Sequence, residues 1–172
     1  MLLRMATVKQ FGFTIIELVV VIAVIVALAA VAVPGLAAFV QSSRLTGLQS
    51  EFMSALALAR SEAVKRDLPV YVSAAASVTG NEFAGGWTIW VDTNRNGVKD
   101  AGEPTVRTHE ALPSVATFSA SNSVIAFSTR GYLSPFTAIQ AKLCEAGTNT
   151  AGYRITVQPS GLSDVANNVS CP

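Results

Sequence analysis

Oxygen-bearing side chains occupy the first, third, fifth, ninth and twelfth places of the run DTNRNGVKDAGE, which spans residues 92–103. This is the ligand spacing of a calcium loop, because hard cations prefer carboxylate and amide oxygens. An EF-hand, however, needs a helix on each side, and here strands are predicted on both sides. Asx and Gly residues also close long hairpin turns by bonding their own backbone, and we favour this Asx-stabilised turn over a metal site. The residues concerned are Asp92, Asn94, Asn96, Gly97, Asp100 and Glu103.

The other residues that could do chemistry form no catalytic arrangement. His109 is the only histidine, and neither cysteine, Cys144 or Cys171, stands in a motif that would make it a nucleophile. No phosphate-binding loop and no zinc-ligand spacing occurs in the sequence. The chain has 12 Lys and Arg against 11 Asp and Glu, a net charge of +1, which gives no support for nucleic acid as a partner. We expect a protein without enzymatic activity, metal or cofactor.

An apolar run of membrane length occupies residues Gly12 to Pro34. It contains no polar side chain between Leu18 and Val33, so it can cross a bilayer as one helix. Glu17 interrupts the run, although an ionised carboxylate costs roughly 2.5 to 3.5 kcal/mol at the membrane centre and requires a partner. Arg4 and Lys9 precede it and favour a cytoplasmic N-terminus. A cleaved secretory signal or a simple signal anchor would leave Glu17 unexplained.

The string KQFGFTIIELVVVIAVIVALAAVAVP resembles the N-terminus of type IV prepilins and pseudopilins, over residues 1 to about 40. The resemblance implies that Gly12 is the last leader residue, removed by a prepilin peptidase, and that Phe13 becomes the N-methylated first mature residue. It also implies that Glu17 meets the N-terminal amine of a neighbouring subunit, since two buried charges cost far less when paired. Pro34 matches the family's helix proline, which bends or loosens the helix near the membrane exit.

After Pro34 the apolar residues recur at steps of three and four, which predicts an amphipathic helix continuing to about Arg66 and ended by Pro69. The segment LALARSEAVKRDLPV resembles the corresponding helix end in the GspH/FimT branch of pseudopilins and minor pilins. Within it, we favour solvated helix positions for Arg60 and Glu62 over a binding role. The apolar residues of the predicted stripe are Leu45, Leu48, Phe52, Leu56, Ala59 and Ala63.

From Val70 onward, short alternating runs broken by Gly, Asn, Ser and Pro predict an antiparallel sheet. The stretch GGWTIWVDTNRNGVKDAGEPTVR is also similar to the GspH/FimT domain, in which a hairpin carries this Asp, Asn, Gly and Glu signature. The predicted strands are Val70 to Ala74, Trp87 to Val91, Thr105 to His109, Val115 to Ser119, Val124 to Ser128, Ile139 to Leu143 and Tyr153 to Gln158.

These pieces predict an α+β type IV pilin fold, with one long N-terminal helix packed on an antiparallel sheet domain. The expected order is a leader at 1–12, a transmembrane and filament-core helix at 13–40, an amphipathic helix half at 41–68 and a periplasmic domain at 69–172. We expect a single-pass protein of the bacterial inner membrane. Both cysteines then lie in the periplasm, which favours a Cys144–Cys171 disulfide over two free buried thiols.

The resemblance implies a minor pseudopilin or minor pilin, a filament subunit in type II secretion or a type IV pilus. Its expected partners are other pilin-like subunits, the prepilin peptidase and the inner membrane. The alternative is DNA uptake, because some FimT-branch members bind DNA through a basic C-terminal motif. Here no arginine follows Gly161, Asp164 has the wrong charge, and Arg130 and Arg154 are isolated in the sequence. An anchored calcium-dependent adhesin built on the 92–103 loop is the weakest alternative.

Overall fold

The computed structural model describes residues 14–75, 78–114, 116–145 and 152–171. One long helix, α1, spans Ile15–Arg66. Residues 1–42 and residues 43–172 form two compact units, so α1 begins in the first unit and ends in the second. The buried hydrophobic residues of the described chain all lie in the second unit, which therefore has a hydrophobic core of its own.

The part of α1 in the second unit is amphipathic, as predicted. All residues of the predicted apolar stripe are buried except Leu48, which is partly buried against the core. Lys65 and Arg66 occupy the last turn, where positive charge interacts favourably with the helix dipole. The helix ends because Asp67 adopts a left-handed conformation, with φ of 53°, and Pro69 follows shortly after.

Eight strands in the described part of the chain form two antiparallel sheets of four strands each, in the orders β3-β2-β1-β5 and β4-β6-β7-β8. The α+β fold is confirmed, and the predicted strands are present, three of them with the predicted bounds and the others with ends displaced by one or two residues. Val115, the predicted start of one strand, lies outside the described residues. The strand bounds are β1 Val70–Ala74, β2 Trp87–Val91, β3 Thr105–His109, β4 Ala116–Ala120, β5 Val124–Phe127, β6 Ile139–Glu145, β7 Gly152–Val157 and β8 Ser163–Val169.

The prediction did not include β8. Its sequence, SDVANNV, has too few apolar residues to alternate clearly, and only Val169 is buried. The strand lies at the edge of its sheet and pairs with β7 alone. An edge strand with one weakly packed face needs little hydrophobic patterning, so its sequence resembles that of a loop.

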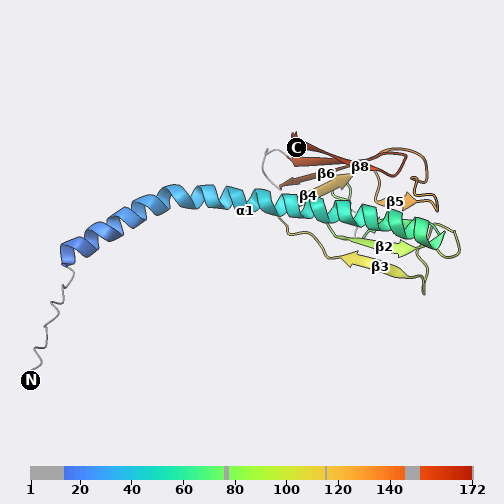
Figure 1. Cartoon of the computed structure of the whole chain (residues 1–172), viewed down its shortest axis with the longest axis horizontal. Helices are drawn as coiled ribbons and strands as arrows, with labels where there is room; N and C mark the ends of the chain where they lie inside the picture. The colour runs from blue at the N-terminus through green and yellow to red at the C-terminus, as the bar shows by residue number, and fades with distance from the viewer. Residues whose placement is uncertain (1–13, 76–77, 115, 146–151, 172) are drawn as a thin grey trace, which may run out of the picture. The chain divides into compact units, whose positions relative to one another are not determined.

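An aromatic cluster around Phe52 joins the helix to both sheets. The Phe52 ring lies edge-on to Trp87 of β2 at 5.1 Å and to Phe118 of β4 at 4.6 Å between centroids. Phe83, from the connection between β1 and β2, completes the cluster at 5.1 Å. All four side chains are buried. Figure 1 shows the final part of α1 alongside strands of both sheets, and the ring contacts place Phe52 against each of them.

The predicted disulfide between Cys144 and Cys171 is present, with the two Cα atoms 5.9 Å apart. It ties Cys171, just after the edge strand β8, to β6, an inner strand of the same sheet. The bond closes a loop of 27 residues that includes β7 and β8.

Replacing Cys171 with serine is expected to lower the free energy of unfolding of residues 43–172 by about 3 kcal/mol, because the unfolded chain regains the freedom of the open loop. Urea denaturation of the wild type and the variant measures the difference. Adding reductant should destabilise the wild type by a similar amount and leave the variant unchanged. Equal stability of oxidised wild type and variant would contradict a stabilising role.

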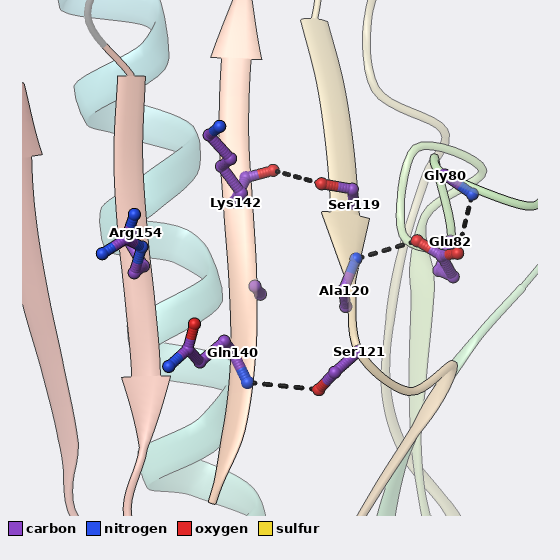
Figure 2. Close-up of a pocket in the computed structure, with 9 residues that line it drawn as sticks. Gly80, Glu82, Ser119, Ala120, Ser121, Gln140, Lys142 and Arg154 are labelled. Carbon is purple, nitrogen blue, oxygen red and sulfur yellow. Dashed lines mark hydrogen bonds between the residues drawn. The ribbon is translucent and has the colours of Figure 1, made fainter. Parts of the chain in front are cut away.

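Glu82 fastens the connection between β1 and β2 to strand β4 of the other sheet. Its carboxylate accepts the backbone N–H groups of Gly80 and Ala120, each at 2.8 Å (Figure 2). Asn81 adds a bond by accepting the Phe118 N–H at 2.6 Å. Hydrogen bonds donated to the charged carboxylate, first of all from Ala120, hold the pKa of Glu82 below its usual value.

Because the folded state lowers the pKa of Glu82, its contribution to stability is present above the unfolded-state pKa and is lost as pH falls through the folded-state pKa. The change Glu82→Gln should therefore cost about 1 kcal/mol at pH 7 and progressively less as the pH is lowered toward about 3. Urea unfolding across this range measures the effect. The control Glu110→Gln changes an exposed carboxylate. A Glu82→Gln cost that does not vary with pH would contradict the charge-based account.

Candidate assembly site

The N-terminus of α1 is capped by Thr14. Its hydroxyl oxygen accepts the Glu17 N–H at 3.3 Å, and its carbonyl oxygen accepts the Leu18 N–H at 3.2 Å. Thr14 and Glu17 thus occupy the first and last positions of a Thr-x-x-Glu pattern, which is a helix-start signal. The negative charge of Glu17 in the first turn is also favourable to the helix dipole. Thr14 was not among the predicted site residues, although this local pattern is sufficient to identify it.

The helix segment that carries Glu17 presents its side chains outward. Ile15–Val33 has a mean hydropathy of 3.1 and is long enough to span a membrane, and its side chains are exposed. Glu17 is itself exposed and forms no salt bridge with another described residue. Gly12 and Phe13, the predicted cleavage and methylation positions, lie outside the described residues. Position 34 lies within α1, and the side chain of Pro34 is not described.

A second outward face of α1 carries small side chains between residues 43 and 61. These recur at alternating steps of four and three, so they form one continuous stripe on the helix. A shallow depression of about 480 Å³ lies at its end and is lined by Ala57, Arg60, Ser61, Val64 and Lys65. Small residues allow a second helix to approach closely. The exposed small residues are Ser43, Gly47, Ser50, Ser54, Ala57 and Ser61.

Arg60 is not the solvated position that the sequence suggested. Its Nε donates to the carbonyl oxygen of Gly131 at 3.0 Å, which connects α1 to a turn 71 residues away. Gly131 and Gly161 pack at this point, and a Cβ atom on Gly161 would lie 2.0 Å from the Gly131 carbonyl oxygen. The Glu62 side chain, which is only 12% exposed, pairs with Lys65 and Arg66 on the same helix. Arg60 therefore has a structural role in attaching the helix to the sheet domain.

The 92–103 loop has the internal hydrogen bonds expected of an Asx-stabilised turn. The buried Asp92 carboxylate accepts the N–H groups of Asn96 at 3.1 Å and Gly97 at 2.8 Å. At the other end, Glu103 accepts the Thr93 N–H at 2.8 Å. The loop therefore uses its first and last carboxylates to bond its own backbone, where Gly97 has a φ of 76°.

His109 joins the edge strand β3 to α1. The ring stacks on Trp87 at 3.9 Å, Nε2 lies 2.8 Å from Glu51 Oε2, and Nδ1 lies 2.6 Å from the Glu110 carbonyl oxygen. Carboxylate and carbonyl oxygens only accept, so both contacts are hydrogen bonds when both ring nitrogens carry protons. The arrangement fixes the helix against the hairpin rather than activating a nucleophile. His109 is thus a partly exposed residue of β3 that also contacts α1.

Comparison with known proteins decides the family of this chain. The family model described as "Type II transport protein GspH" matches residues 49–161. The chain belongs to the GspH family. The match includes most of the helix half that packs on the sheets, the 92–103 hairpin and strands β1 to β7. A search of curated proteins gives no significant match.

Solved structures confirm the fold of this GspH-family chain. The type IV minor pilin FimU of Pseudomonas aeruginosa is similar with a TM-score of 0.62 at 21% identity, over 78% of this chain and 99% of that one. The minor pseudopilin EpsH from the type 2 secretion system of Vibrio cholerae is similar with a TM-score of 0.52 at 14% identity. This match covers 69% of this chain and 92% of the EpsH chain. The predicted pilin-like architecture is therefore confirmed.

Proposed function

We propose that this chain is a minor pseudopilin or minor pilin, a structural subunit of a periplasmic filament in type II secretion or a type IV pilus. The observation that supports this most strongly is the combination of a GspH-family domain with the exposed apolar helix Ile15–Val33 on the same chain. Before assembly, the helix anchors the subunit in the inner membrane, with the domain at residues 69–172 in the periplasm. In the filament, the same apolar surface packs against other subunits.

The assembly site is built from the N-terminal end of the chain. A prepilin peptidase removes residues 1–12 after Gly12, and Phe13 becomes the methylated N-terminus. The Glu17 carboxylate, which has no ion pair with another described residue, then meets the N-terminal amine of a neighbouring subunit. Pro34 loosens the helix where it leaves the apolar core, because proline removes a backbone donor.

The small-residue stripe at residues 43–61 supports a helix-to-helix contact along the filament. Its members are exposed although they lie on the same helix as the buried Phe52 stripe. One face of this helix half thus packs on the subunit's own core. The opposite face is available to contact a helix of another subunit. Close approach is favourable there because no large side chain separates the two backbones.

The change Gly12→Val is expected to leave the leader attached, because the larger side chain occupies the cleavage position. Mass spectrometry of the intact membrane-bound protein should show a heavier chain with an unmethylated N-terminus. The matched control Ala6→Val alters the leader by a similar volume away from the cleavage position and should be processed normally. A Gly12→Val protein that begins with methylated Phe13 would contradict the proposed processing.

A further inference from the structure

Two cations face each other on the exposed side of the β4-β6-β7-β8 sheet. Lys142 of β6 is the direct cross-strand partner of Arg154 of β7. The same row continues to Ser119 of β4 and Ala166 of β8, so it contains no carboxylate. Arg154 is isolated in the sequence, but the strand register brings Lys142 beside it.

Neither Lys142 nor Arg154 forms a salt bridge with another described residue. Like charges directly opposite on neighbouring strands destabilise a sheet. Asp164 pairs with Thr156, diagonally from Arg154, but forms no salt bridge with it. The other nearby carboxylate, Glu82, accepts the backbone N–H groups of Gly80 and Ala120 and forms no salt bridge with either cation. An external anion would therefore interact favourably with both cations.

A cleft of about 350 Å³ contains the pair and supplies further polar groups. Figure 2 shows Lys142, Gln140 and Arg154 on the two neighbouring strands, with Ser119 and Ser121 on the adjoining segment and Glu82 beyond it. Hydroxyl and amide groups beside a guanidinium and an ammonium form a donor set suited to an oxyanion. The cleft is open to solvent and is large enough for a side chain, not for a folded element.

We propose that this face docks a partner protein by seating one of its Asp or Glu carboxylates between Lys142 and Arg154. The planar Arg154 guanidinium can bind a carboxylate through two N–H groups, while Lys142 adds a second charge. A nucleic-acid backbone fits less well, because its closely repeated charges would also meet Glu82 and Asp164. The proposal does not depend on the filament function, since it concerns only the binding chemistry of this face.

The test uses the full chain in detergent micelles and the peptide Ac-Gly-Glu-Gly-NH₂, followed by amide NMR shifts. The peptide should produce saturable, salt-sensitive shifts at residues 119, 140, 142 and 154, and Ac-Gly-Gln-Gly-NH₂ should not. The double variant Lys142→Gln/Arg154→Gln should lower the affinity at least tenfold. It should remain folded, because it removes a repulsive pair. The control Lys99→Gln/Arg107→Gln removes the same number of exposed cations elsewhere and should bind as the wild type does.

Three results would overturn the proposal. The first is equal binding of the Glu and Gln peptides, and the second is unchanged affinity of the Lys142→Gln/Arg154→Gln variant. The third is that a duplex DNA oligonucleotide shifts the same amide signals at a lower concentration than the Glu peptide does. That result would assign the face to nucleic acid. Any of these would leave the filament proposal standing, since leader processing and filament incorporation are measured independently.

Discussion

The variant Glu17→Ala should remain in the membrane, with its leader removed, but should be almost absent from the filament. In the proposed filament, the mature N-terminal ammonium of one subunit enters an apolar core, where the Glu17 carboxylate of its neighbour compensates the charge. Removing one partner of a buried pair costs about 3 to 5 kcal/mol, equivalent to a loss of more than a hundredfold in affinity. Membrane insertion should not suffer, because alanine is less costly in lipid than a carboxylate.

The measurement for Glu17→Ala is the ratio of the subunit in sheared filaments to the subunit in the membrane fraction. The helix cap is retained, because Thr14 bonds the backbone N–H of residue 17 and not its side chain. The control Leu18→Ala truncates the neighbouring side chain without removing a charge and should incorporate far better. Wild-type incorporation of Glu17→Ala would remove the proposed role of the carboxylate.

The variant Phe52→Ala should lower the free energy of unfolding of residues 43–172 by about 3 to 5 kcal/mol. Phe52 is fully buried and contacts aromatic rings from both sheets, so its loss leaves a cavity where helix and sheets meet. Edge-to-face contacts add about 0.5 to 1.5 kcal/mol each beyond the burial of area. A loss of this size is comparable to the whole stability of a marginal domain.

Urea denaturation of residues 43–172 tests the Phe52 prediction. The control is Phe136→Ala, which removes the same side chain from a position that is 68% exposed and should cost less than about 1 kcal/mol. If both variants lose the same stability, Phe52 does not act as the junction of the three layers.

Much of the fold was predictable because local patterns and tertiary packing agree. The apolar stripe that includes Phe52 and Leu56 has helical spacing, and it is the face that packs on the sheets. Strands such as β2, whose sequence WTIWV is almost wholly buried, have a strong local signal. Strand β8 was missed because an edge strand with one buried residue needs no such signal.

The contacts that fasten these elements together were not predictable in the same way. Arg60 and Gly131 are 71 residues apart, and His109 and Glu51 are 58 residues apart, so no local pattern connects them. Lys142 and Arg154 become neighbours only through the register of β6 and β7. Such contacts depend on the strand register and on how the helix packs on the sheets. The sequence patterns predicted the individual elements but neither of these arrangements.

Crosslinking and mass spectrometry of the native membrane-derived assembly test the central proposal most directly. We expect crosslinks from exposed positions of residues 43–61 to other pilin-like subunits, in a chain that begins with methylated Phe13. The identity of those subunits would also assign the chain to a secretion system or to a pilus. An assembly in which this chain retains residues 1–12 and crosslinks to no pilin-like subunit would contradict the proposal that it is a filament subunit.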